Sequence, residues 1–352
     1  MQEMKITQLK DAVFQGRQCS LEGGRLLLWP LSGVEVTLRS RELYVELEEK
    51  GDGQISWFAA WVDGAPVVRF PVQKGKNWYP VLLGMDETVP HRVTLVNESQ
   101  PIKGDGKRLI LHSIRWEGEL LPAEKMQYQI EFIGDSLTTA EGCAGPRSAA
   151  EWKTAWMSPS FGYAKRVGDV LNARVHLISQ SGWGVCSDWT GVTENNIPGI
   201  YEQLCGILPE GQTDYDFPVC MDAVVLNLGT NDYSAVESMP EEKRNEQLEK
   251  IVHSAEAFLR RLRILHPDAY ILWSYGMCGG ELGPYLERAV NTVRAEGDVR
   301  VGYVQLLACA EEETGSLHHP GVANHEKAAA AIAEHLMKAW FKQAQKPEEN
   351  IE

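Results

Sequence analysis

Four short polar segments in the second half of the chain carry the side-chain types of a nucleophilic catalyst. They are Gly134-Asp135-Ser136-Leu137, Ser181-Gly182-Trp183-Gly184, Gly229-Thr230-Asn231-Asp232 and His318-His319-Pro320. A hydroxyl nucleophile needs a base within hydrogen-bond reach, and the oxyanion formed on attack needs fixed donors. Ser136 can supply the hydroxyl. His319 can supply the base, because an unperturbed imidazole pKa of about 6.5 permits proton uptake and return near neutral pH.

Three donors are candidates for an oxyanion hole. They are the backbone N–H groups of Ser136 and Gly182 and the side-chain amide of Asn231. Asp135 and Asp232 are interpreted as structural residues that fix the Ser136 and Asn231 loops through hydrogen bonds. Neither aspartate is assigned a catalytic role.

Each of these residues, taken alone, also has a purely structural explanation. Ser136 suits a helix N-cap, and Gly182 suits a tight turn. Asn231 with Asp232 suits an Asx turn, and His319 before a proline suits an extended, solvated loop. The catalytic hypothesis rests on their occurrence in chain order at successive strand ends.

The elements that must position these residues begin after Pro122. Five apolar runs alternate there with segments of helical length, expected over residues 161–171, 240–266, 282–295 and 324–343. The runs are QIEFIG, VHLISQ, AVVLNLG, AYILWSYG and VRVGYVQLL. Continuously apolar strands joined by helices indicate βαβ units and a parallel sheet covered on both faces. Ligands bind beyond the carboxyl ends of such strands, so the four polar segments should meet at one sheet edge.

Residues 24–121 have a different pattern. Runs such as VEVTL, LYVELE and HRVTLV alternate apolar and polar residues between Gly, Asp, Asn and Pro, as is typical of an antiparallel sandwich. We predict two domains, an all-β sandwich over residues 1–122 and a three-layer α/β domain over residues 123–352. The junction at residues 119–125 is short, so the domains are expected to pack together. Residues 345–352 are expected to be frayed.

Composition and motif content narrow the classes of partner and cofactor. There are 34 basic and 49 acidic residues, a net charge of −15, and no basic run, so no nucleic-acid partner is expected. No apolar stretch is long enough to span a membrane, and no leader is visible, so a cytoplasmic location is predicted.

The seven cysteines form no CxxC pair and are interpreted as reduced thiols. The absence of a GxSxG elbow disfavours the ordinary α/β-hydrolase fold. HExxH and GxGxxG motifs are also absent, so neither metal nor other cofactor is expected. The oligomeric state is not predicted.

The four ordered segments resemble the motif blocks of the SGNH, or GDSL-type, hydrolases. With the preceding sandwich, the chain resembles carbohydrate esterase family 2, acetyl esterases with an N-terminal jelly roll. The resemblance implies a flavodoxin-like hydrolase domain in which Ser136 attacks an acetyl carbonyl and His319 transfers the proton. It also implies that Ser136, Gly182 and Asn231 hold the oxyanion. The implied reaction removes acetyl groups from sugar hydroxyls, often at the 6-position of hexoses in mannan- or xylan-derived sugars, without a metal.

One position departs from the superfamily pattern. An aspartate commonly lies three residues before the catalytic histidine, and here that position is Ser316. Members of family 2 manage with a Ser-His dyad in which a backbone carbonyl orients the imidazole, and the same arrangement is expected here. The alternative orienting acids are Glu311, Glu312 and Glu313.

Aromatic residues suggest where a sugar would bind. Trp183 and Trp189 are predicted to form a stacking wall for a sugar ring, and His318 is predicted to line the pocket. Core packing is the expected role of Trp152, Trp156 and Trp273, because tryptophan buries a large apolar area.

Three functions remain open from the sequence. The leading hypothesis is a deacetylase of short acetylated oligosaccharides. A lipase or thioesterase of the same superfamily would instead have a long apolar channel. A non-catalytic carbohydrate-binding protein is the third, and the intact set of Ser136, Gly182, Asn231 and His319 argues against it.

Overall fold

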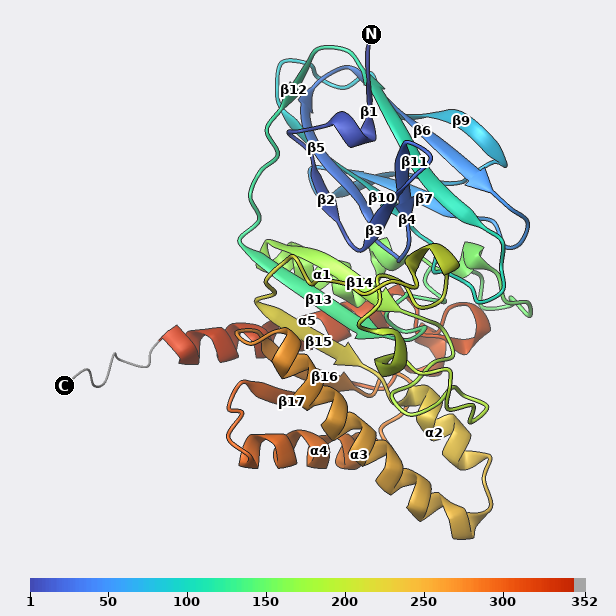
Figure 1. The fold of residues 1–352 in the computed structure, drawn as a ribbon, viewed down its shortest axis with the longest axis vertical. Coiled ribbons are helices and arrows are strands. Elements are labelled where there is room, and N and C mark those ends of the chain that lie inside the picture. Colours follow the sequence, from blue (N-terminus) through green and yellow to red (C-terminus); the bar gives the residue numbers. More distant parts are fainter. Residues whose placement is uncertain (345–352) are drawn as a thin grey trace, which may run out of the picture.

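The structure is a computed structural model that describes residues 1–344, so the expected fraying of residues 345–352 lies outside it. Figure 1 shows two parts in contact, antiparallel strands on the N-terminal side and a parallel sheet flanked by helices. The change in strand pairing falls between β12 (Glu119–Leu121) and β13 (Tyr128–Gly134), next to the expected junction. The division into two domains at residue 122 stays a prediction.

The N-terminal part consists of two antiparallel sheets that face each other. One has the order β3-β4-β11-β6-β9, with β1 paired to β11, and the other has the order β12-β5-β10-β7-β8, with β2 paired to β5. Leu43, Val45 and Leu47 of β6 are fully buried while their neighbours are partly exposed, because successive strand residues face opposite sides. Besides β12, the strands are Gln2–Lys5 (β1), Val13–Gln15 (β2), Gln18–Leu21 (β3), Gly24–Leu27 (β4), Gly33–Arg39 (β5), Glu42–Lys50 (β6), Trp57–Val62 (β7), Ala65–Pro71 (β8), Gly75–Leu83 (β9), His91–Asn97 (β10) and Arg108–Trp116 (β11).

The C-terminal part contains the expected parallel sheet, in the order β14-β13-β15-β16-β17. Strands β14, β15 and β16 are buried at every position, which explains their largely apolar sequences. Helices α1 and α5 cover one face, and α3 and α4 cover the other. Besides β13, the elements are Ala173–Ser179 (β14), Ala223–Asn227 (β15), Tyr270–Tyr275 (β16), Val301–Gln305 (β17), Tyr163–Leu171 (α1), Thr230–Glu237 (α2), Glu241–Leu265 (α3), Gly283–Ala295 (α4) and Val322–Ala344 (α5).

Four helices match the expected ranges, and α2 was not anticipated. The Asx turn considered for Asn231 and Asp232 is instead the first turn of this helix. Gly229, with φ 128°, makes the sharp turn from β15 into α2, and a Cβ there would lie 2.9 Å from Leu282. Eight residues form little more than two turns, which is too short for a clear apolar period in the sequence.

The two parts share a buried interface, as the short junction predicted. Trp29 is fully buried among side chains of the C-terminal core, and its Nε1 donates to the Leu204 carbonyl at 2.9 Å. Arg17, on the N-terminal side, donates to the Gln203 carbonyl at 2.7 Å and pairs with Glu131 of β13 at 3.3 Å. These contacts hold the sandwich against the edge and face of the parallel sheet.

Two observations bear on the environment of the chain. All seven cysteines are free. Among residues 1–344, no helix combines the length and the apolar character that crossing a membrane requires.

A buried histidine joins the two parts and should make their association sensitive to acid. His176 of β14 accepts the Gly16 N–H through Nδ1 at 3.1 Å and contacts Gln129 Oε1 through Nε2 at 3.0 Å. Burial lowers the pKa of His176 to about 4, helped by the positive charges of Arg174 and Arg17 and opposed by Glu131. Protonated Nδ1 would point a hydrogen at the Gly16 N–H.

We expect His176 to stabilise the fold fully above pH ~6.5, its unfolded pKa, and to lose that contribution as pH falls toward about 4. Between pH 7.5 and 5, the free energy of unfolding of the wild type should fall by about 2 kcal/mol more than that of His176→Gln. Urea denaturation at both pH values measures this difference, with His253→Gln on the exposed side of α3 as the control. Parallel losses in wild type and His176→Gln would contradict the assignment.

Candidate active site

The carboxyl ends of β13, β14 and β15 lie side by side and carry three of the four polar segments. Gly134 at the end of β13 pairs with Ser179 of β14 and with Asn227 of β15. Ser136 and Gly182 follow these strand ends within a few residues, and α2 starts just beyond the third. The fourth segment reaches the same edge through the turn η7 (Ser316–His318) that precedes α5. The parallel register therefore gathers the residues that the sequence separates.

Ser136 and His319 form a hydrogen-bonded pair. His319 Nε2 lies 3.0 Å from Ser136 Oγ, and His319 Nδ1 lies 3.2 Å from the Leu317 carbonyl oxygen. A carbonyl only accepts, so Nδ1 carries the ring hydrogen and Nε2 is left to accept the Ser136 proton. Ser136 is 7% exposed and lines a cavity. This is the geometry of a serine with its general base.

A strained turn aims the Leu317 carbonyl at the imidazole. Leu317 (φ 55°, ψ 32°) and His318 (φ 58°) are consecutive residues in the left-handed region, a conformation that costs about 1–3 kcal/mol for each non-glycine residue. Hydrogen bonds on both sides hold the turn, since Gly315 N donates to the His319 carbonyl at 2.7 Å and His319 N donates to the Ser316 carbonyl at 3.1 Å. The hydrogen-bond partner of His319 Nδ1 is therefore a backbone carbonyl.

The alternative acids do not reach the imidazole. Ser316 is fully buried, and its hydroxyl has no hydrogen-bond partner among the described residues. Glu311 and Glu312 are exposed on the short turn η6 (Glu311–Glu313), and Glu313 pairs with Lys327 of α5. Within residues 1–344, none of these glutamates forms a hydrogen bond or ion pair with His319.

A carboxylate that the sequence did not single out lies beside His319. Glu141 Oε1 is 3.8 Å from His319 Nδ1, and its other oxygen accepts the Ser181 hydroxyl at 2.7 Å. Its side chain is buried, and its backbone N–H donates to the Ser136 carbonyl at 2.9 Å, which closes the turn after the nucleophile. Glu141 ends the stretch IGDSLTTAE, but nothing in that stretch indicates that the chain doubles back toward the histidine.

The three candidate oxyanion donors differ in whether their hydrogens already have acceptors. Among the described residues, neither the Ser136 N–H nor the Gly182 N–H donates to any acceptor, so both are available. Asn231 Nδ2 donates to Asp135 Oδ2 at 3.1 Å and to the Trp183 carbonyl at 3.0 Å. An amide has two hydrogens, so Asn231 would have to share one of them with a bound oxyanion.

The two aspartates have the structural positions expected of them. Asp135 is fully buried, accepts the Leu137 N–H at 2.9 Å and receives the Asn231 amide. Burial raises the pKa of Asp135 to about 7, and the carboxylates of Asp232 and Glu141 add to the increase. Asp232 accepts three backbone N–H groups, from Val185, Cys186 and Ser187, at 2.8, 2.7 and 3.1 Å. Burial also raises the pKa of Asp232.

A cavity of about 330 Å³ opens over the Ser136–His319 pair. Trp189 lines it and is 61% exposed, and its role as a sugar platform stays a prediction. Trp183 was expected to contact substrate, but it is 8% exposed and packs in the core. His318 is exposed and is not among the residues that line this cavity, so its predicted contact with a sugar stays a prediction. Trp183 directly follows Gly182, and His318 directly precedes His319, so each lies on a turn that positions a candidate site residue.

The three tryptophans expected in the core lie in different environments. Trp273 is fully buried, as expected, and donates to the Leu228 carbonyl at 3.1 Å. Trp156 is half-buried and donates to the Glu151 carbonyl at 2.8 Å. Trp152 was expected in the core, but it lines the cavity. It lies in the irregular segment between β13 and α1, where no periodicity indicates which way a side chain faces.

Two more lining residues come from the N-terminal part and were not foreseen. Gln100 and Ile102 follow β10 and reach the cavity that holds Ser136. The alternating pattern of strands says nothing about the direction of the loop between two of them. Among the described residues, no cluster of three or more His, Cys, Asp or Glu side chains could hold a metal ion.

Comparisons with known proteins agree with this architecture. No family model matches the chain. It is 28% identical to the cellulase/esterase CelE of Acetivibrio thermocellus over 86% of its own length, and it spans only 36% of that relative. It is 24% identical to an acetylxylan esterase / glucomannan deacetylase of Cellvibrio japonicus, over 88% of this chain and 84% of that one.

Two solved structures extend the likeness over almost the whole chain. An acetyl xylan esterase from the rumen bacterium Butyrivibrio proteoclasticus superposes with a TM-score of 0.92 at 30% identity, covering 97% of this chain and 98% of that one. A family two carbohydrate esterase from Clostridium thermocellum, in complex with cellohexaose, superposes with a TM-score of 0.82 at 26% identity, covering 94% and 99%.

The parallel sheet and the Ser, Gly, Asn and His residues at its carboxyl edge define the class of SGNH hydrolases. The match to the Butyrivibrio esterase includes the antiparallel sheets as well as the hydrolase part. The chain belongs to carbohydrate esterase family 2.

Replacing Asp232 should loosen the loop that carries Gly182. In Asp232→Asn, an NH₂ group would face backbone N–H groups of residues 185–187, and the free energy of unfolding should fall by about 1–3 kcal/mol. Turnover should fall with it, because that loop presents the Gly182 N–H. Urea denaturation and esterase kinetics test both effects, with Glu237→Gln on the exposed side of α2 as the control. An unchanged unfolding free energy would contradict the structural role.

Proposed function

We propose that this carbohydrate esterase removes O-acetyl groups from sugar hydroxyls through an acetyl-enzyme intermediate. The observation that carries the proposal is the 3.0 Å contact between Ser136 Oγ and His319 Nε2 under a cavity lined by Trp152 and Trp189. Indole faces suit the C–H faces of a sugar ring, while the serine lies at the cavity floor. The relatives described as acetyl xylan esterases and as a glucomannan deacetylase support acetylated xylo- and manno-oligosaccharides as the substrate class.

In the proposed mechanism, His319 Nε2 takes the Ser136 proton as the Oγ attacks the acetyl carbonyl carbon. The carbonyl oxygen becomes an oxyanion, held by the free N–H groups of Ser136 and Gly182 and by one shared hydrogen of Asn231. The imidazolium then protonates the sugar oxygen as its bond to the acetyl carbon breaks. Water attacks the acetyl-serine after losing a proton to His319, and acetate leaves when Ser136 regains its hydrogen.

We propose that Ser136 and His319 act as a dyad oriented by the Leu317 carbonyl. The support is the 3.2 Å contact to Nδ1 and the left-handed turn that produces it. Glu141, at 3.8 Å, is beyond hydrogen-bond distance from the ring and adds negative charge near the imidazolium. It is the one carboxylate among the described residues that pairs with His319.

The lining of the cavity favours this proposal over a lipase or thioesterase. Gln100, Glu141, Gln180 and Ser181 place polar groups around the serine, whereas a long acyl chain requires a continuous apolar channel. The likeness to a GDSL-like lipase is at 13% identity and concerns the fold alone.

We further propose that residues 1–122 form a jelly-roll domain and residues 123–352 the hydrolase domain. In support, the sheets contain the strand sets β4-β11-β6-β9 and β5-β10-β7-β8, so most consecutive strands lie in opposite sheets, as in a jelly roll. A cytoplasmic location is proposed on the seven free cysteines, because thiols persist in a reducing compartment.

The first test is acetate release from acetylated xylo- and manno-oligosaccharides by wild type and Ser136→Ala. We expect wild type to release acetate and the variant to lose at least about 10⁴-fold in kcat, because the attacking oxygen is gone. NMR of the product identifies the acetyl position. If folded wild type cleaves none of these sugars but hydrolyses long-chain acyl esters, the lipase alternative is correct.

The second test separates a dyad from a triad. Ser316→Ala and Glu313→Gln should leave kcat within about twofold, and Glu141→Gln should lower it by about tenfold at most, because only a nearby charge is removed. His319→Ala should abolish turnover. A loss of about 10⁴-fold in Glu141→Gln would make Glu141 the third member of a triad.

A further inference from the structure

Four consecutive polar residues, Asn97 to Gln100, are buried between the two parts of the chain, with exposures of 4%, 0%, 5% and 6%. Glu98 reaches into the C-terminal part. It accepts the Ser158 hydroxyl at 2.7 Å and the Ser160 N–H at 3.3 Å, and it pairs with Arg69 of β8 at 3.3 Å. A carboxylate without solvent is stable only where such donors surround it, so this position is held firmly.

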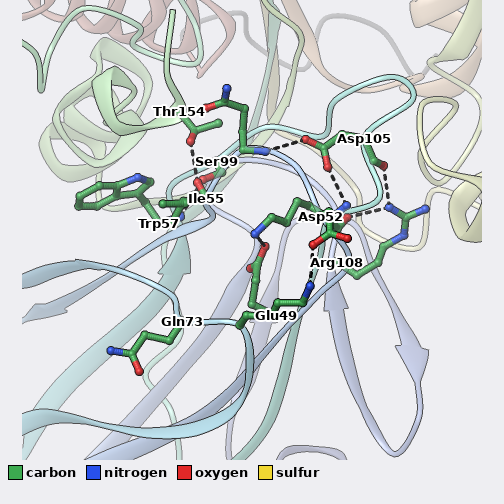
Figure 2. Close-up of polar contacts among 12 residues, drawn as sticks. Glu49, Asp52, Ile55, Trp57, Gln73, Ser99, Asp105, Arg108 and Thr154 are labelled. Carbon is green, nitrogen blue, oxygen red and sulfur yellow. Dashed lines mark hydrogen bonds and ion pairs between the residues drawn. The ribbon is translucent and has the colours of Figure 1, made fainter.

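The neighbouring residues anchor the same segment to the antiparallel sheets. Ser99 Oγ accepts the Trp57 N–H of β7 at 2.8 Å, and the Ser99 N–H donates to Asn97 Oδ1 at 2.9 Å. Beyond the cavity, Asp105 accepts the N–H groups of Gln54 and Lys107 at 3.0 and 2.7 Å. Figure 2 shows Ser99 and Asp105 in this cluster of polar contacts. The loop from β10 to β11 is therefore fixed on both sides of Gln100.

Gln100 has an unambiguous orientation. Its Oε1 accepts the Ser181 N–H at 2.9 Å and lies 3.3 Å from the Thr139 hydroxyl. A backbone N–H only donates, so the atom facing Ser181 is the oxygen and the NH₂ group is on the other side. Among the described residues, the Gln100 NH₂ group donates to no acceptor, and Gln100 lines the cavity above Ser136 and His319.

We propose that Gln100 is a specificity-determining residue through which the antiparallel part of the chain binds the sugar. Its NH₂ group donates a hydrogen bond to a sugar oxygen near the scissile acetyl group, while Trp189 contacts the ring face. A few fixed polar groups in a cavity orient a ligand, and Gln100 is fixed before the sugar arrives. The inference rests on the proposed function and adds the group that distinguishes a sugar ester from a plain acetate ester.

The test compares an acetylated xylo-oligosaccharide with 4-nitrophenyl acetate, which has no sugar oxygen. Gln100→Glu keeps an oxygen for the Ser181 N–H and removes the donor. The added carboxylate lies near the oxyanion and should slow both esters, whereas the lost donor affects only the sugar ester. The kcat/KM on the sugar ester should therefore fall about tenfold more than that on 4-nitrophenyl acetate, with the extra loss mainly in KM. Gln100→Met, which also leaves the Ser181 N–H without a partner, should lose on both substrates.

The control is Gln73→Glu, an exposed glutamine of the same part of the chain, which should change neither substrate. Thermal unfolding of each variant checks that the fold is kept. Equal losses on both esters in Gln100→Glu, or no loss on the sugar ester, would overturn the inference while leaving the esterase function intact. Failure of wild type to release acetate from any acetylated sugar would instead overturn the proposed function, and this inference with it.

Discussion

The register between β13 and its two neighbours is the constraint on which the active site depends. Because Gly134 lies level with Ser179 and Asn227, the turns that follow all three strands start from adjacent points of one sheet edge. The strand order changes direction beside β13, and this is where parallel sheets open a crevice for ligands. A one-residue shift would turn each following loop away from the other two. The buried, branched side chains of these strands hold that register.

The second condition is the set of buried polar contacts between the two parts of the chain, here called the polar seam. Two sets of contacts bury charged groups. Arg17 pairs with Glu131, and Glu98 accepts hydrogen bonds from serine donors. A charged group is stable out of solvent only where it has such partners. Apolar burial around Trp29 supplies the non-directional attraction, and these pairs select one relative position of the parts. That single position matters for catalysis because the cavity has walls from both sides of the seam.

Buried carboxyl groups lie near the candidate active site, so an oxyanion formed there would need hydrogen bonds from backbone N–H groups. Asp135, Asp232 and Glu141 are buried within one region. In the proposed mechanism, such surroundings favour the imidazolium and oppose the oxyanion. The unpaired backbone N–H groups of Ser136 and Gly182 would stabilise that oxyanion without adding a full charge to the site. Burial, with a smaller contribution from the carboxylates of Asp232 and Glu141, raises the pKa of Asp135 to about 7, so its charge also depends on pH.

The sequence by itself determined the order of the elements, the parallel sheet and the identity of the residues gathered at its edge. Apolar runs report burial, and Ser136, Gly182, Asn231 and His319 follow such runs or precede a helix in chain order, so local pattern was sufficient. The sequence did not reveal helix α2, because eight residues are too few to show a helical period of apolar positions.

Only the tertiary structure decided which irregular segments face the cavity. Gln100, Glu141 and Trp152 line it, whereas Trp183 turns into the core. Loop side chains have no period that encodes direction, and the two sides of the seam meet across long sequence separations. The orientation of His319 likewise depends on the left-handed turn at Leu317. The sequence does not predict this turn, because leucine rarely adopts a left-handed conformation.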